Sequence, residues 1–240
     1  MLHQANHWIE IAEIAVSALL LCRILLLRLH RVYLFITLAC VLGLLFDGVR
    51  LWLGEKSQAS QRIFDYSSFL YAVVFPMAAW DVFEEIKNQV AKLRRLALGR
   101  LVSSLFLTVI FGLIMNALID TNDTNGEPSV VSMLALILWV GACAASLAFL
   151  YTIYQVLRKQ PITRPNNTNV WMYYYGLSFL AEVLSFFLWF VASAATKSES
   201  TGDVLAIVFN TFGIALTIWC ILKLRAIPSD LPSASESARL

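Results

Sequence analysis

One acidic residue lies near the middle of a long apolar segment, where it could bind a proton, a cation or a polar ligand. The segment is residues 170–195, VWMYYYGLSFLAEVLSFFLWFVASAA, and the acid is Glu182. About 20 apolar residues are enough to cross a bilayer as a helix. A carboxylate at that depth is costly in lipid, so we expect Glu182 to face protein or a cavity.

Glu182 shares a helix face with other polar side chains. They recur at the helical period and are Ser178, Glu182, Ser185, Trp189 and Ser193. Interpreted functionally, this stripe is a ligand or proton site inside a bundle, where burial favours the protonated acid. Interpreted structurally, Glu182 is a hydrogen-bonded carboxyl that pins its helix to a neighbour. Arg23 in the first apolar segment is either its counter-ion or a side chain that reaches the lipid headgroups, and we favour the headgroups.

A second polar group lies at what we predict below to be the outer ends of the first three apolar segments. Its members are Glu10, Glu13, Asp47, Arg50 and Asp65. Asp47 and Arg50 are three residues apart and share a helix face, which favours a salt bridge near the membrane surface. The alternative is an acidic outer vestibule that opens into the bundle.

His3, His7 and Glu10 have the spacing of one helix face and carry atoms that can bind a metal. They lie at an N-terminus and lack a fourth ligand, so we interpret them as polar residues of an outer tail. No metal or cofactor is expected, and no catalytic residue is identified. The four cysteines lie in apolar segments, which favours buried thiols over disulfides.

Residues 87–100, KNQVAKLRRLALGR, contain good helix formers and no proline, so we expect them to extend the third helix into the cytoplasm. Glu84 and Lys87 can pair within that helix. Arg94 and Arg95 can contact anionic lipid.

Two further features concern helix geometry. Pro76 should kink the third helix, because it removes one backbone hydrogen bond. Gly141, Ala145 and Ala148 form a face of small residues, for which we expect close helix packing.

A bundle of membrane-spanning helices must position these residues, because the chain is strongly apolar. Of its 240 residues, 59% are hydrophobic and 14% are charged, against about 25% charged in soluble domains. Backbone in lipid must satisfy its own hydrogen bonds, so the expected fold class is an all-α transmembrane bundle. Seven apolar segments are near the length of one span: residues 8–29, 32–53, 63–86, 101–119, 130–157, 170–195 and 204–224. They form one domain, residues 1–226, before a short disordered tail, residues 227–240.

Lysine and arginine set the orientation of these segments. The connections on one side hold Arg28, Arg31, Lys87, Lys92, Arg94, Arg95, Arg100, Arg158, Lys159 and Arg164. The loops on the other side hold only Lys56, Arg62 and Lys197. We therefore predict that the N-terminus lies outside and the C-terminus in the cytoplasm, which fits an odd number of spans.

Two stretches carry a resemblance to known proteins: WDVFEEIKNQVAKLRRLALGR after the third segment and WMYYYGLSFLAEVLSFFLWF in the sixth. With the topology, they resemble small uncharacterised seven-helix membrane proteins of bacteria and, more loosely, the seven-helix sensor regions of histidine kinases. The resemblance implies a non-enzymatic protein of the bacterial inner (plasma) membrane, and it transfers no catalytic residue.

We expect a sensor or receptor whose polar interior responds to a ligand or to the state of the membrane. It would relay that signal to a cytoplasmic protein through residues 87–100 and 158–169. The alternatives are a small-solute or proton-coupled transporter that uses Glu182, and an accessory subunit of a membrane complex. The expected partners are the lipid bilayer, a cytoplasmic protein and a second copy in a homo-oligomer, and not nucleic acid.

Overall fold

The computed structural model of the protein describes residues 2–54, 57–95, 97–99, 101–103, 106, 110, 130–159, 165–196 and 199–227. Every regular element in these ranges is helical. The α-helices are α1 (Leu2–Leu26), α2 (Leu34–Leu53), α3 (Gln58–Asp81), α5 (Val130–Lys159), α6 (Asn166–Thr196) and α7 (Glu199–Lys223). Two short 3-10 helices, η1 (Leu29–Arg31) and η2 (Glu84–Ile86), follow α1 and α3.

Five helical stretches are long and apolar enough to cross a membrane. They are Leu34–Leu53, Gln58–Asp81, Leu134–Lys159, Asn166–Trp189 and Val204–Lys223. Lipid offers no hydrogen-bond partner for backbone N–H and C=O groups, and a helix pairs these groups within itself. The protein is therefore an all-helical integral membrane protein. The helix α1 is not among the five, and its first half carries several polar side chains, Glu10 and Glu13 among them.

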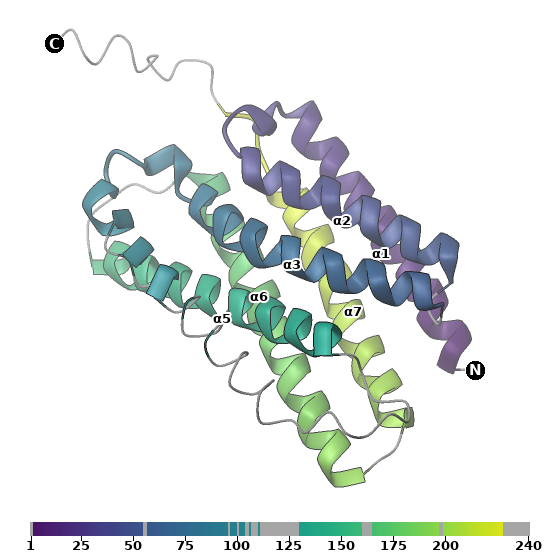
Figure 1. The fold of residues 1–240 in the computed structure, drawn as a ribbon. Helices are drawn as coiled ribbons and strands as arrows, with labels where there is room; N and C mark the ends of the chain where they lie inside the picture. The colour runs from purple at the N-terminus through teal and green to yellow at the C-terminus, as the bar shows by residue number, and fades with distance from the viewer. Residues whose placement is uncertain are drawn as a thin grey trace, which may run out of the picture.

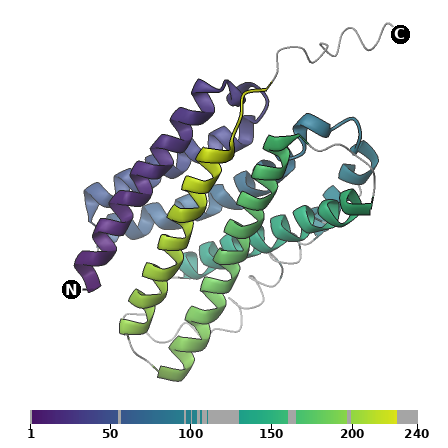
Figure 2. The ribbon, with the colours of Figure 1, turned by 180° about the vertical axis from the view of Figure 1, so that it is seen from behind.

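The helices α1, α2, α3, α5, α6 and α7 form a closed ring. Each packs against the next in the order α1, α2, α3, α5, α6 and α7, and α7 packs back against α1. Figure 1 shows α2 and α3 on the near side of the ring, and Figure 2 shows α1, α7 and α6 from behind. A side chain that interacts with a helix other than its two neighbours must therefore point into the ring.

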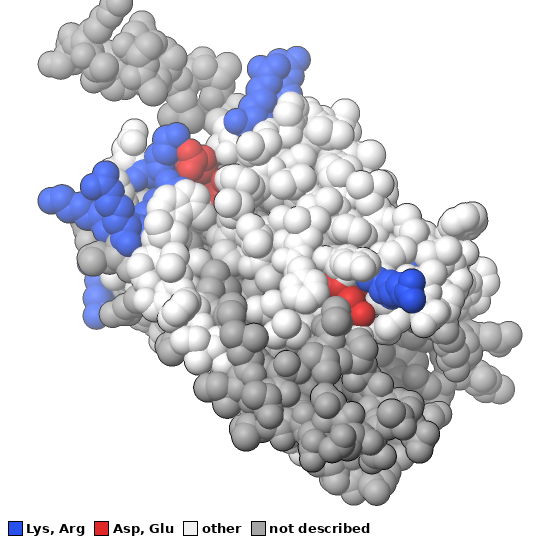
Figure 3. Space-filling model, viewed as in Figure 1, with Lys and Arg blue, Asp and Glu red and all other residues white. Residues whose placement is uncertain are grey.

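Basic side chains gather at one end of the ring, which we call the basic end. It contains the ends of α1, α3, α5 and α7 and the starts of α2 and α6. Most of the lysines and arginines visible in Figure 3 lie there. The opposite end contains the start of α3 and the loop between α2 and α3. The predicted orientation of the chain in the membrane depends on this excess of lysine and arginine at one end.

Aromatic rings run through the bundle toward the basic end. Their centroids are 5.5 Å apart for Trp139 and Phe75, 5.4 Å for Phe75 and Phe179, and 5.4 Å for Phe179 and Tyr175. The series continues at 6.0 Å from Tyr175 to Trp171 and at 5.9 Å from Trp171 to Tyr33. We call these six residues the aromatic column. Its last four members are buried, so the column fills the bundle on the basic side.

The prediction that residues 87–100 extend α3 is wrong. The helix ends at Asp81, and the chain turns through η2 before helical structure resumes at residue 91, in the described residues 91–95, 97–99 and 101–103. Arg94 folds back, and its Nη2 donates to the Trp80 carbonyl at 3.2 Å and to Glu84 Oε2 at 3.1 Å. The last carbonyls of a helix have no partner within it. Arg94 supplies one here, which stabilises the turn.

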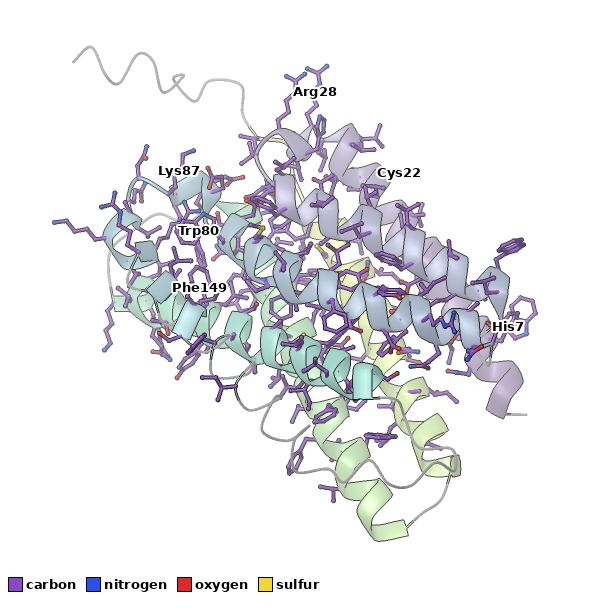
Figure 4. All side chains as sticks on the ribbon, in the orientation of Figure 1. His7, Cys22, Arg28, Trp80, Lys87 and Phe149 are labelled. Atoms are coloured by element: carbon purple, nitrogen blue, oxygen red, sulfur yellow. The ribbon has the colours of Figure 1, made fainter. Side chains whose placement is uncertain are left out.

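Arg94 also lies flat on an aromatic ring. Its guanidinium carbon is 4.1 Å from the centroid of Trp80, which stacks in turn on Phe149 of α5 at 6.1 Å. Figure 4 shows Trp80 and Phe149 side by side between α3 and α5. Arg94 is only 5% exposed, so the predicted contact with anionic lipid does not apply to it. Arg95 beside it is exposed.

Helix boundaries differ from the prediction mainly at the ends. α1 ends at Leu26, because Arg28 adopts a left-handed conformation with φ 56°. α3 begins at Gln58, where the Ser57 hydroxyl caps the helix by accepting the N–H of Ser60 at 3.1 Å. The chain remains helical through Pro76. The predicted helix over residues 101–119 lies outside the described residues apart from 101–103, 106 and 110, and so does the predicted tail apart from Ile227.

The three residues of the predicted small-residue face of α5 differ in how deeply they are buried. Ala145 is buried, at 3% exposed, whereas Ala148 is exposed and Gly141 is half-buried. Close packing therefore concerns Ala145 more than the rest of the predicted face.

Candidate functional site

Glu182 of α6 points into the ring. It hydrogen-bonds the side chain of Trp139 in the neighbouring helix α5, and it interacts electrostatically with Asp47 of α2 and Glu13 of α1. Neither α1 nor α2 is a ring neighbour of α6. The carboxyl nevertheless belongs to an exposed residue. Part of the Glu182 residue is thus exposed, while its carboxyl group lies among protein groups that include Trp139 and Asp47.

Two further acids face the same interior together with one arginine. Glu13 interacts with Asp47, Glu182 and Arg50, and Asp47 interacts with Arg50 of its own helix. Glu13, Asp47 and Arg50 are each half-buried. We call Glu13, Asp47, Arg50 and Glu182 the interior acid cluster. The sequence placed Glu182 in one site and the other three in another, whereas the structure brings them together.

Arg50 neutralises only part of this cluster. Its guanidinium carbon lies 5.4 Å from the ring centroid of Phe64, which stacks on Trp139 at 5.9 Å. Its electrostatic partners are Asp47 and Glu13, while Glu182 interacts with Trp139 and Asp47. Glu182 forms no ion pair within the described part of the chain. It is therefore the acid of the cluster that has no compensating cation.

The cluster lies in the half of the bundle away from the basic end. Asp47 precedes the end of α2 at Leu53 by less than two turns, and Glu182 precedes Trp189 by about two turns. At about 1.5 Å per residue, each lies about 10 Å inside its apolar stretch. The aromatic column begins at Trp139, which touches Glu182, and extends from there to the basic end. The aromatic column thus lies between the cluster and the basic end.

Tyr71 of α3 completes the surroundings of the cluster. It is 7% exposed, it interacts electrostatically with Asp47, and its ring lies 5.1 Å from that of Trp139. A Cβ at Gly43 would lie 3.4 Å from its hydroxyl oxygen. Gly43 is one turn before Asp47 on α2, so the hydroxyl faces the Asp47 side of that helix. It forms no hydrogen bond with any described residue.

The predicted stripe on α6 does not surround the Glu182 carboxyl. Ser185 donates its hydroxyl hydrogen to the backbone carbonyl of Glu182 at 2.9 Å, within its own helix. Trp189 lies farther along α6 and faces α7, where a Cβ at Gly202 would lie 3.9 Å from its ring. Ser178 is half-buried. The donor to Glu182 is Trp139 of α5, which the sequence did not single out.

Arg23 lies at the basic end and does not pair with Glu182. Its Nη2 donates to the carbonyl of Leu224, just past the end of α7, at 3.2 Å. Asn166, the first residue of α6, donates to the carbonyl of Lys223 at 2.8 Å. Both side chains satisfy carbonyls that a helix end leaves unpaired. Arg23 therefore ties α1 to α7 and does not serve the interior acid cluster.

Asp65 and Glu10 are not shown in the cluster either. Asp65 of α3 accepts hydrogen bonds from Gln61 at 3.2 Å and from Ser132 of α5 at 2.8 Å, so it joins these two helices. Glu10 lies one turn before Glu13 and is half-buried. His7 lies at the opposite end of the bundle from Arg28 (Figure 4). Among the described residues, no three His, Cys, Asp or Glu side chains are placed to hold a metal ion.

A second polar group at the basic end joins α6 to the segment after α7. Asn167 donates to the Arg225 carbonyl at 2.8 Å, and its Oδ1 accepts the Arg225 N–H at 3.0 Å. Asn167 also donates to Glu85 of η2 at 3.4 Å, and the buried Tyr33 hydroxyl interacts electrostatically with the same carboxyl. Burial raises the pKa of Glu85. This group fixes the helix ends and is not accessible in the way Glu182 is.

Comparisons with models of protein families, with curated proteins and with solved structures find no match for this chain. The functional argument therefore depends on the geometry above.

Proposed function

We propose that the protein is a proton-coupled transporter of a small solute in the bacterial inner membrane, with Glu182 as its proton-binding group. The observation that supports this most directly is that Glu182 faces Asp47 and Glu13 across the ring, belongs to an exposed residue and has no compensating cation in the described part of the chain. An acid in a bundle interior is costly unless it binds a proton or a cation, so such residues mark ion and proton pathways. Asp47 and Glu13 add negative charge beside it, which favours uptake of a positive charge.

The aromatic column supports transport because it closes one side of the cluster. Phe75 contacts Trp139 and Phe179 in this column, and the next residue, Pro76, lacks the N–H that would bond to the preceding turn. A helix is more easily bent at such a point. Bending α3 there would move Phe75 and open the cluster toward the basic end, as alternating access requires.

The proposed topology has seven spans with the basic end in the cytoplasm. α3 ends at the basic end, whereas α5 begins at the other end. The opposite positions of these two helix ends support one further span in addition to the helices that the structure describes. The excess of Lys and Arg at the basic end supports the orientation.

Proton flux in vesicles tests the proposal. The purified chain is reconstituted with a pH-sensitive dye inside, and a potassium diffusion potential drives proton entry. We expect flux in the wild type and its loss in Glu182→Gln, which keeps the shape and a hydrogen-bond acceptor for Trp139. Glu84→Gln removes an acid at the basic end and should retain flux. Equal flux in Glu182→Gln and wild type would contradict the proposal.

A sensor is the second candidate, and the polar groups at the basic end favour it. Arg23, Asn166 and Asn167 connect α1 and α6 to the end of α7, so movement in the ring would reach the basic surface. A photo-crosslinker at exposed Lys87 tests this function. A sensor should give one cytoplasmic adduct whose yield changes in Glu182→Gln, and a transporter should give none.

A further inference from the structure

The interior acid cluster has features that distinguish among cationic ligands, and this inference rests on the proposed function. The cluster contains three carboxyls and one guanidinium. Arg50 interacts with Asp47 and Glu13 and lies over Phe64, which leaves Glu182 without a cation among the described residues. Glu182 is itself an exposed residue. A positively charged ligand is therefore the class that this site can stabilise.

A multidentate metal ion does not fit this arrangement. Hard cations such as Ca²⁺ require six or more oxygen ligands at about 2.3–2.6 Å, and Mg²⁺ requires six at closer range. The acids come from three different helices, and no three described acid, His or Cys side chains are close enough to hold a metal. A ligand at this site has to contact one carboxyl directly and interact with the other two electrostatically, at longer range.

Tyr71 indicates that this ligand carries hydrogen-bond donors. Its hydroxyl faces Asp47 and forms no hydrogen bond with any described residue, although the side chain is more than nine-tenths buried. A phenol oxygen beside a carboxylate is an acceptor for N–H groups. An ammonium ion can donate to both a carboxylate and the phenol, whereas a quaternary ammonium ion cannot.

The walls next to these groups are aromatic. Tyr71 stacks on Phe75 at 4.9 Å and meets Trp139 edge-on at 5.1 Å. Arg50 over Phe64 already shows a cation held against an aromatic ring at this site, an arrangement that is attractive in proteins. Rings of this kind accommodate the apolar part of a ligand.

We propose that the interior acid cluster binds a small organic primary ammonium ion, with its N–H groups on Glu182 and the Tyr71 hydroxyl and its alkyl part against the aromatic rings. A hydrogen bond to a charged group contributes enough to change affinity by about tenfold or more. The ligand class is thereby narrowed from any small cation to amines that retain N–H donors.

Binding to the purified full-length chain tests this proposal. The probes are n-propylammonium, tetramethylammonium and potassium chlorides at equal ionic strength, and the readouts are thermal midpoint and calorimetric affinity. We expect only propylammonium to raise the midpoint. Its affinity should be lost in Glu182→Gln and fall about tenfold in Tyr71→Phe, which removes one acceptor while keeping the ring. Glu84→Gln, the matched control at the basic end, should bind as the wild type does.

The outcomes separate this inference from the proposed function. Equal midpoint shifts with tetramethylammonium or potassium would overturn the ammonium site, and so would full affinity in Tyr71→Phe. Proton flux that still requires Glu182, without propylammonium binding, would overturn this inference alone. Propylammonium binding at Glu182 without any proton flux would overturn the proposed transport and leave the site.

Discussion

The carboxylate of Asp81, the last residue of α3, accepts the backbone N–H of Ile36 at 3.3 Å and also that of Phe35, so one helix caps the start of another. Tyr33, at the N-cap position of α2, makes no side-chain hydrogen bond to its own helix. The first N–H groups of a helix need an external acceptor. Asp81 provides it from a residue far away in sequence, which fixes the end of α3 against the start of α2.

Replacing Asp81 with Ala should therefore destabilise the fold at α2. Loss of a helix N-cap costs about 0.5–2 kcal/mol, and Asn caps about as well as Asp. We expect Asp81→Ala to lower the free energy of unfolding by about 1–2 kcal/mol and Asp81→Asn to change it much less. Chemical denaturation in detergent measures both. Equal losses in the two variants would mean that the charge of Asp81 matters more than its acceptor oxygens.

The ion pairs of Glu84 should make stability depend on pH. Burial alone would raise the pKa of this carboxyl, but hydrogen bonds from Lys87 and Arg94 outweigh it and hold the pKa below its ordinary value of 4.5. The folded state then binds the proton more weakly than the unfolded state. The contribution is complete above pH 4.5 and is lost as the pH falls from 4.5 through the lowered pKa.

Thermal midpoints at about pH 7 and about pH 3.5 test this dependence. The wild type should lose more stability between these values than Glu84→Gln, which cannot ionise. A drop of the same size in both proteins would assign the pH dependence to other groups.

Ala145 should not tolerate a larger side chain, because it is buried between helices. Overpacking a core position typically costs about 1–3 kcal/mol, so we expect a loss of that size in Ala145→Leu. Ala148→Leu makes the same change on the same helix at an exposed position and should be close to neutral. The ratio of folded to aggregated protein after heating in detergent compares the two. Similar behaviour of both variants would argue against tight packing at Ala145.

The orientation can be tested with cysteines at two exposed positions. Gln58 lies at the start of α3 and Lys87 lies after η2 at the basic end. In intact cells, a membrane-impermeant maleimide should label Gln58→Cys but label Lys87→Cys only after permeabilisation. The unsubstituted protein gives the background from its native thiols. The reverse pattern would place the basic end outside.

The helices could be predicted from the sequence because hydropathy and length are local properties. Their ends depended on contacts that no local pattern reveals. α3 ends where Asp81 caps α2 and where Arg94 returns to the Trp80 carbonyl, and both partners come from other parts of the chain. Residues 91–95 and 97–99 are helical, as their propensity favours, but these tertiary contacts separate them from α3.

The candidate site was only partly predictable for a similar reason. Helical periodicity shows which residues share a face, but it does not show which helices face one another. From the sequence, Glu182 and Asp47 were therefore assigned to two separate candidate sites, although they interact across the ring. Tyr71 and Trp139 gave no signal, because aromatic residues in apolar helices usually belong to the core.

The contact of Arg23 with the Leu224 carbonyl has a consequence for the order in which the bundle is assembled. The chain is made from its N-terminus, so α1 exists long before α7 is made. Until then Arg23 lacks this acceptor, and the edges of α1 and α6 that α7 will cover are unpacked. Synthesis of α7 and of the residues just after it completes the ring of helices. It also provides the carbonyls that Arg23, Asn166 and Asn167 bind. Enclosure of Glu182 is thus among the last events in the biogenesis of this protein.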